Sequence, residues 1–267
     1  MFSSRRWIIF QIDTGFKYSH QPYWVKIENQ EYLFFCGADN YIKGKYGDDE
    51  YDYMPWKIYY GDWDAGKLNN IKRFNTGLKL RDIECSPYIV HDGTRLQISF
   101  IGGVFDLEDV CRYNLYYLLT TNLFNGALDF DKAQPRIISS SPVFTGFQSF
   151  KYQLRNWQEQ ECELEHLNTG GYSQTFYPPE FDGIRRIIGT PENPDYALIT
   201  GVKDGTYKTY LYNLDSLKAI REIKVGEESV YKSCLTDKGI IHARCVGEFE
   251  ERKLYYSDSR QFAFHEP

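Results

Sequence analysis

The amino-acid sequence predicts an all-β fold assembled from repeated units. A stretch that begins at Pro22 and ends at Gly37 returns between Pro87 and Gly102, 65 residues later (87 minus 22), and the two copies align without a gap. Each copy reads as two strands joined by a tight turn, and a weaker copy begins at Lys232. Recurrence at a fixed spacing is typical of arrays of like β-units.

The composition agrees with this fold class. Tyr (23) and Phe (18) supply most of an aromatic share of 17%, whereas Met (2) is scarce, which favours sheets over helical bundles. All-β chains of 267 residues commonly form one unit, and no linker is visible, so we expect a single domain over 1–267.

Strands follow one another along the chain. The segments that alternate or run apolar between turn residues are Trp7 to Ile12, Tyr23 to Ile27, Tyr32 to Cys36, Trp56 to Gly61, Tyr88 to Val90, Leu96 to Ile101 and Asn114 to Thr120. A tyrosine-centred strand ends each unit. It recurs at Lys57 to Tyr60, Asn114 to Tyr117, Lys208 to Tyr212 and Lys253 to Tyr256.

The spacing predicts five units. The 145 residues between Pro87 and Lys232 (232 minus 87) hold two further units of similar size, and one more spans the end of the chain and its beginning. The strand at Trp7 to Ile12 then completes the sheet of the last unit, which closes the ring of a five-bladed β-propeller and leaves no exposed edge. Four units with a large insertion near 143–182 remain the alternative.

Two polar segments interrupt the pattern. Gln158 to Leu167 predicts an exposed insertion, either a short acidic helix or a polar hairpin, and Tyr41 to Tyr53 predicts a long surface loop. The acidic residues at 47–52 are of the type that binds Ca²⁺, but their spacing does not match an EF-hand loop. We therefore expect a solvated loop and no cofactor.

Charge and hydropathy exclude several classes of protein. The net charge of −6 without a long basic run argues against a nucleic-acid partner. The apolar run Trp7 to Phe10 is too short for a signal peptide, and no segment is long enough to span a membrane. We expect a soluble protein made in the cytosol, either free or part of a virus particle. The six cysteines form no C-x-x-C pair and the histidines lack ligand spacing, so reduced core cysteines and no metal site are expected.

The unit openings resemble those of the five-bladed β-propeller glycoside hydrolases of families 43 and 32. The resemblance rests on His20-Gln21-Pro22 with its following strands and on Glu84-Cys85-Ser86-Pro87 with the turn Asp92-Gly93. It implies hydrolysis by three carboxylates that converge at the centre of the ring, where one activates water, one protonates the leaving oxygen and one tunes the pKa values.

This chain departs from that carboxylate pattern. Gln21 and Ser86 stand where the resemblance implies the first two acids. When the copies of the repeat are aligned, these positions form one column, and Tyr231, beside Lys232, occupies it in the weaker copy. Glu84 resembles the acid of the Glu-Cys-Pro motif of family 32, which makes it the candidate general acid, with Asp82 as the second candidate catalytic residue.

The remaining candidates are ligand-binding residues. They are His20, Gln21, Arg81, Ser86, Trp63, Tyr231 and Lys232. Trp63, flanked by Asp62 and Asp64 after a strand end, is expected to be an exposed platform for a sugar ring.

Three functions fit this sequence. The first is a carbohydrate-recognising propeller that is weakly active or non-catalytic, for instance a recognition or structural component of a virus particle or cell surface. The second is an active glycoside hydrolase that uses Glu84 as its general acid. The third is a scaffold for protein partners, because tyrosine-rich surfaces are typical of recognition faces. The fold alone does not distinguish these three functions.

Overall fold

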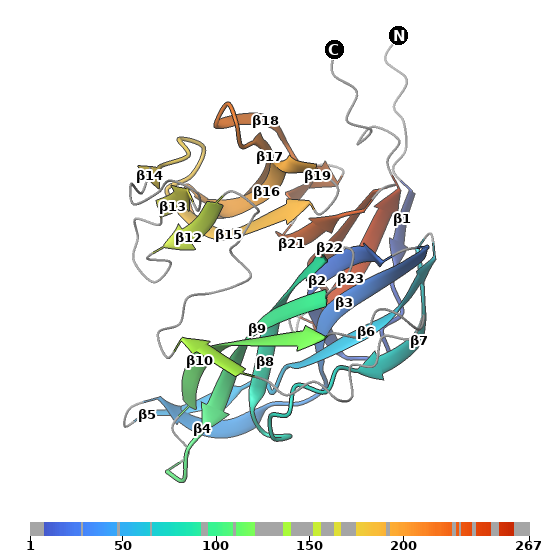
Figure 1. The fold of residues 1–267 in the computed structure, drawn as a ribbon, viewed down its shortest axis with the longest axis vertical. Coiled ribbons are helices and arrows are strands. Elements are labelled where there is room, and N and C mark those ends of the chain that lie inside the picture. The colour runs from blue at the N-terminus through green and yellow to red at the C-terminus, as the bar shows by residue number, and fades with distance from the viewer. Residues whose placement is uncertain are drawn as a thin grey trace.

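The protein is an all-β structure. The computed structural model describes residues 8–27, 29–46, 49–64, 66–91, 96–108, 111–120, 136–139, 152–155, 163–166, 175–190, 193–225, 228–229, 231–236, 239–246 and 251–258. These residues form strands and their connections (Figure 1), so they hold no helix long and apolar enough to cross a membrane.

The two copies of the sequence repeat open the first and second sheets. The first sheet has the order β2-β3-β6-β7, formed by β2 (Tyr18–Ile27), β3 (Gln30–Ala38), β6 (Lys57–Asp64) and β7 (Lys67–Arg73). The second sheet has the order β11-β10-β9-β8, formed by β8 (Ile83–His91), β9 (Leu96–Phe105), β10 (Cys111–Thr120) and β11 (Arg136–Ser139). All neighbours pair antiparallel, so each sheet is a meander whose first strand is an edge.

Two further sheets follow. The third consists of β12 (Tyr152–Arg155), β13 (Glu163–His166) and β14 (Thr175–Phe176). The fourth is a meander of β15 (Gly183–Thr190), β16 (Asn193–Lys203), β17 (Thr206–Asn213) and β18 (Lys218–Glu222). A small hairpin of β19 (Lys224–Val225) and β20 (Glu228–Ser229) leads to the last sheet.

The last sheet joins the two ends of the described chain. It consists of β21 (Tyr231–Leu235), β22 (Gly239–Val246), β23 (Glu251–Asp258) and β1 (Ile8–Gln11), in the order β1-β23-β22-β21. β1 pairs antiparallel with β23, with Phe10 opposite Tyr256. This pairing confirms the prediction that the N-terminal strand completes the sheet of the last unit.

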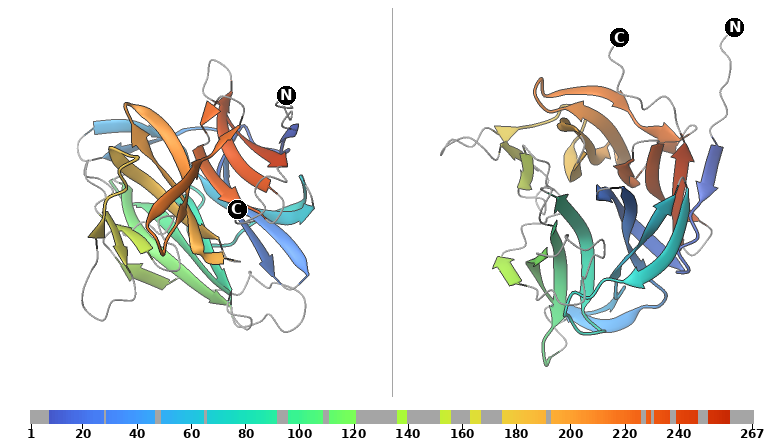
Figure 2. Two further views of the ribbon diagram at one scale, coloured as in Figure 1. Left: turned by 90° about the horizontal axis from the view of Figure 1, so that it is seen from above. Right: turned by 45° about the vertical axis from the view of Figure 1, so that its right-hand side comes forward.

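The sheets pack face to face, which explains the long apolar runs of their inner strands. In β3, Leu33 and Phe35 face the last sheet, whereas Phe34 and Cys36 face the second sheet. Successive residues of a strand point to opposite faces, so a strand between two layers must be apolar at nearly every position. The right-hand view of Figure 2 shows green, blue, red and orange strands following one another around the molecule.

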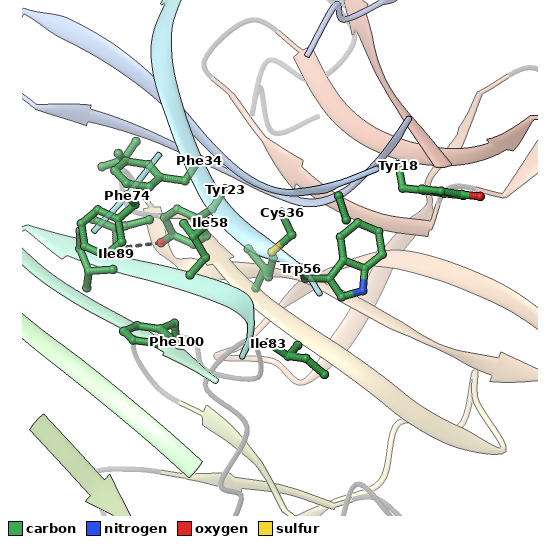
Figure 3. Packing of buried hydrophobic residues seen from close by; sticks show 14 of the residues in the cluster. Tyr18, Tyr23, Phe34, Cys36, Trp56, Ile58, Phe74, Ile83, Ile89 and Phe100 are labelled. Atoms are coloured by element: carbon green, nitrogen blue, oxygen red, sulfur yellow. Dashed lines mark hydrogen bonds between the residues drawn. The ribbon is translucent and has the colours of Figure 1, made fainter. Parts of the chain in front are cut away.

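The largest apolar cluster lies between the first and second sheets. Tyr23, Phe34, Phe74 and Phe100 are all at most 1% exposed there, and the Tyr23 hydroxyl donates to the carbonyl of Ile89 at 3.0 Å. Figure 3 shows this hydrogen bond at the end of the cluster where Phe34, Phe74 and Ile89 lie. The aromatic residue that follows Pro22 in the repeat is therefore a core residue with a satisfied hydroxyl.

Two segments differ from the predicted loops. Within 41–53 the chain forms a hairpin of β4 (Ile42–Tyr46) and β5 (Asp49–Tyr53), while Gly47 and Asp48 lie outside the described residues. A Cβ at Gly44 would lie 2.5 Å from the Phe105 ring, so the hairpin packs against the second sheet. A glycine allows this close approach, which composition alone did not reveal. Within 158–167 the described part is the strand β13, which is paired with β12.

Candidate functional site

A bulge recurs in the inner strand of four sheets, at the column where the sequence predicted site residues. The register shifts lie between His20 and Tyr23 in β2, Cys85 and Tyr88 in β8, Ile184 and Arg186 in β15, and Tyr231 and Cys234 in β21. Two residues of β2, Gln21 and Pro22, thus face one residue of β3, and β8 and β21 repeat this arrangement. Bulges of this kind redirect side chains and are frequent beside binding sites.

Gln21 is the strained member of this column. Its φ is 50°, in the left-handed region that costs a non-glycine residue about 1 kcal/mol. Its Oε1 accepts a hydrogen bond from the Cys36 thiol at 3.3 Å. The side chain is half-buried and carries an amide, which can donate to and accept from a ligand but cannot serve as a general base.

Glu84 is enclosed between the first and second sheets. Its side chain is 0% exposed. Oε1 accepts hydrogen bonds from Lys57 Nζ at 3.2 Å and from Arg73 Nη2 at 3.1 Å, and Oε2 accepts one from the Ile58 amide at 3.3 Å. Two cations and a backbone donor thus hold this carboxylate away from solvent.

Asp82 is fixed in the same region. Its side chain is 1% exposed and accepts hydrogen bonds from the backbone amides of Lys79 at 2.9 Å and Phe105 at 3.3 Å. Lys57, which is 6% exposed, donates to the carbonyls of Lys79 and Asp82 as well as to Glu84. Burial lowers the pKa of Lys57, and the charge of Glu84 opposes that shift.

The structure therefore places both candidate catalytic residues beside Lys57, which donates to the Glu84 carboxylate and to the backbone carbonyl of Asp82. The Glu84 carboxylate meets two cations and a backbone amide, and the Asp82 carboxylate meets two backbone amides. The start of β6 lies beside β8 at this point, where the Glu84 amide donates to the Trp56 carbonyl at 2.7 Å. In this arrangement neither carboxylate is open to a substrate oxygen, and the cluster joins two sheets.

Aromatic rings gather near the start of β2. His20 is 3% exposed and lies against Trp56 with the ring centroids 3.8 Å apart. Tyr41 is 55% exposed and contacts buried Tyr18 edge-on at 5.9 Å, and Lys17 Nζ lies 5.2 Å from the centre of the Tyr18 ring. Figure 3 shows Tyr18 and Trp56 at the end of the apolar cluster that lies away from Phe34 and Phe74. Tyr41 was not predicted as a site residue, because it belongs to the segment predicted as a loop.

The other candidates are scattered in the structure. The Arg81 guanidinium lies over the Phe105 ring at 5.0 Å, beside Asp82. Ser86 and Lys232 occupy the bulges of β8 and β21. The prediction that Tyr231 shares the column of Gln21 and Ser86 is wrong, because Tyr231 pairs with Ala243 and the bulge begins one residue later, at Lys232. The side chains of Ser86, Tyr231 and Lys232 lie outside the described part of the structure. The prediction of an exposed Trp63 is wrong: it is 4% exposed and packs edge-on against Tyr256 at 5.2 Å. β6 continues through Asp64, so strand alternation turns Trp63 toward the last sheet.

Arg186 connects the bulges of neighbouring sheets and was not predicted as a site residue. It lies in the bulge of β15 and is 5% exposed. Its guanidinium donates to the carbonyls of Pro22 and Ser233, each at 3.4 Å, and so links the inner strands of three sheets at their bulges. The sequence signal was weak, because Arg185-Arg186 precedes the apolar Ile187-Ile188 without the proline that marks the first two copies.

The described residues contain no group of three or more His, Cys, Asp or Glu side chains placed to hold a metal ion. In the acidic hairpin, Asp52 forms an ion pair with Lys43 at 2.6 Å. Within the described residues, no disulfide involves Cys36, Cys85, Cys111 or Cys234. Burial raises the pKa of the Cys234 thiol to about 12, so it is not a nucleophile at neutral pH.

No family model and no curated protein matches this chain. Among solved structures, a provisionally assigned hydrolase from Bacteroides ovatus ATCC 8483 has 9% sequence identity and a TM-score of 0.44 over 90% of this chain and 85% of its own. The polysaccharide lyase Uly1 has 10% identity and a TM-score of 0.34 over 88% of this chain and 57% of its own. Likenesses this distant are no basis for assigning a family or an activity.

Proposed function

We propose that this chain is a five-bladed β-propeller that recognises carbohydrate without cleaving it. Support for the architecture comes from the meander order of the sheets and from the pairing of β1 with β23, which a closed ring requires. In a propeller each blade packs against its two neighbours, and the first sheet packs in this way against the second and the last. The three strands β12, β13 and β14 occupy the place of the third blade.

The observation that carries the non-catalytic proposal is the position of the two acids. Glycoside hydrolysis needs two carboxyl groups that face one substrate across the scissile bond. Asp82 and Glu84 are at most 1% exposed and bind amides and cations of the chain itself. The bulge column, where open acids are needed, carries Gln21, Ser86 and Lys232 instead.

The surface around the start of β2, defined by Tyr41 and Gln21, supplies groups that a sugar needs. Tyr41 presents a half-exposed ring, which can stack on the apolar C–H face of a pyranose. Gln21, three residues after Tyr18 on β2, offers an amide that can donate to and accept from sugar hydroxyls. We place the glycan between these two side chains. Recognition of surface glycans by a virus particle or a cell is a setting in which this function fits.

A glycan array followed by calorimetric titration of the best ligand tests the proposal. We expect binding without release of new reducing ends, and Tyr41→Ala should weaken binding roughly tenfold, the equivalent of one stacking contact. Tyr207→Ala is the matched control, because Tyr207 is a similarly exposed tyrosine (43%) on β17 in the fourth sheet.

Three results contradict the proposal. If the wild-type chain hydrolyses a glycan and Glu84→Gln abolishes hydrolysis but not binding, the chain is an active glycoside hydrolase. A lack of response to every sugar leaves a scaffold for protein partners. An equal loss of glycan affinity in the Tyr41 and Tyr207 variants shows that the site is not at the surface around the start of β2.

A further inference from the structure

Two leucines stand out on the surface of the described part of the chain. Leu107 is 104% exposed and Leu80 is 77% exposed, more than any other large apolar side chain there. Each lies in a turn, Leu80 between β7 and β8 and Leu107 between β9 and β10. Turns of this kind usually carry glycine, proline or polar residues. A single exposed leucine needs no explanation, but two that lie side by side form a patch that does.

Asp82 holds the two turns next to each other. Its carboxylate accepts hydrogen bonds from the amide of Lys79 at 2.9 Å and from the amide of Phe105 at 3.3 Å. Lys79 directly precedes Leu80, and Phe105 precedes Leu107 by two residues. Because one carboxylate binds both backbones, the two leucines belong to one patch of the surface.

The turn over 79–82 is rigid. The amide of Asp82 donates to the carbonyl of Lys79 at 3.1 Å, which closes the turn. Buried Lys57 donates to the carbonyls of the same two residues, and Glu84 in turn holds the Lys57 ammonium. The buried charges thus fix the shape of the surface above them. A surface that is already ordered loses little conformational entropy on binding, so it is suited to docking.

The turn that carries Leu107 is also held in place. The amide of Glu108 donates to Asp106 Oδ1 at 3.0 Å. The Arg81 guanidinium lies 5.0 Å from the centre of the Phe105 ring, which connects this turn to the first one a second time. Both leucines are therefore presented to solvent by fixed backbones.

The two halves of the patch carry opposite charges. Lys79 is exposed and directly precedes Leu80, whereas Glu108 is exposed and directly follows Leu107. A patch with one positive and one negative apolar half is complementary to itself when a second copy is turned by 180°. A membrane surface fits less well, because its negative charge repels Glu108.

We propose that Leu80 and Leu107 form the centre of a twofold-symmetric contact between two copies of this chain. Leu80 of one copy packs on Leu107 of the other, and Lys79 of one copy pairs with Glu108 of the other, so that each contact occurs twice. Four leucine side chains make a small interface, and the association is accordingly weak, with a Kd on the order of 0.1 mM. The contact does not depend on the proposed recognition of carbohydrate.

Sedimentation velocity of the full chain between about 10 µM and about 1 mM measures this association. The wild type should pass from monomer to dimer in that range, and Leu80→Ser or Leu107→Ser should raise the Kd roughly tenfold or more, because each leucine is buried twice per dimer. Both side chains are exposed, so the variants should keep the urea unfolding curve of the wild type. Ile220→Ser is the matched control and should keep the wild-type Kd, since Ile220 is a 50% exposed aliphatic residue on β18 of the fourth sheet.

Charge reversal tests whether the partner is a second copy. Lys79→Glu and Glu108→Lys should each abolish dimers when measured alone, because like charges then face each other twice. An equimolar mixture of the two variants should form dimers, because every reversed charge then meets an opposite one.

Three results overturn the proposal. These are a wild type that stays monomeric at about 1 mM, leucine variants that associate like the wild type, and a mixture of the charge variants without dimers. A monomeric chain that binds anionic phospholipid vesicles, and loses this binding in Leu80→Ser, also overturns it and assigns the patch to a membrane surface.

Discussion

Lys57 Nζ lies 3.2 Å from Glu84 Oε1, and both side chains are buried where the first sheet meets the second. Arg73 contacts the same oxygen at 3.1 Å, so one carboxylate is shared by two cations from β6 and β7. A carboxylate bound in this way stabilises the junction of two sheets, because its removal leaves a buried positive charge without compensation.

Glu84→Gln should therefore destabilise the fold. We expect a loss of about 3 kcal/mol in the free energy of unfolding, since the amide keeps some hydrogen bonds but not the charge. Urea denaturation measures this loss. Asp52→Asn is the control, because its partner Lys43 is 79% exposed and exposed pairs contribute less than about 1 kcal/mol. A Glu84 variant as stable as the control contradicts the structural role.

His242 should make the protein sensitive to acid. Burial, with a smaller contribution from Arg244, lowers the pKa of His242 to about 3 from 6.5. Between these values the unfolded chain binds a proton that the folded one does not, so stability is complete above pH 6.5 and declines as the pH falls toward 3. The unfolding equilibrium constant rises by up to about tenfold for each pH unit in that window.

The measurement is a comparison of two pH profiles. His242→Gln removes the titrating ring, so its stability should change less steeply between pH 6.5 and 4 than that of the wild type, while the carboxylates affect both chains equally. Parallel profiles would mean that His242 is protonated in the folded state without cost.

The repeat in the sequence predicted the inner strands well, because burial on both faces leaves a local signature. Tyr23 and Phe34 follow directly from that apolar run, and so does the N-terminal strand that pairs with β23. The environment of Glu84 was not predictable, since its partners Lys57 and Arg73 lie 27 and 11 residues away along the chain. Trp63 was misassigned because its acidic neighbours hid a strand that continues through Asp64.

The sequence predicted where the candidate site residues lie along the strands, but not which groups surround them. The column at Gln21 and Ser86 does coincide with bulges in β2 and β8. Arg186 escaped notice because its hydrogen bond to the Pro22 carbonyl spans 164 residues, and no local pattern encodes such a contact.

Gln21 offers a test of backbone strain at the bulge. Gln21→Ala and Gln21→Gly both remove the amide that accepts a hydrogen bond from the Cys36 thiol. Of the two new residues, only glycine adopts a φ of 50° without an energetic cost. The glycine variant should be the more stable of the two by about 1 kcal/mol in thermal or urea unfolding. Both should bind the glycan equally weakly, because both lack the amide. An alanine variant as stable as the glycine variant means that the bulge relaxes to another conformation.

The N-terminal strand should be essential to the fold although it is four residues long. A chain that begins at Ile12 lacks β1 and leaves the backbone groups of β23 without their partners, including those of Tyr256 opposite Phe10. An exposed strand edge destabilises a sheet and recruits other chains, so we expect a lower melting temperature and oligomers in size-exclusion chromatography. A chain that lacks residues 1–7 keeps β1 and is the control, which should remain as stable as the full chain. If both truncated chains behave alike, the pairing of β1 with β23 contributes little, and the closure of the proposed ring must rest on the contacts between sheets.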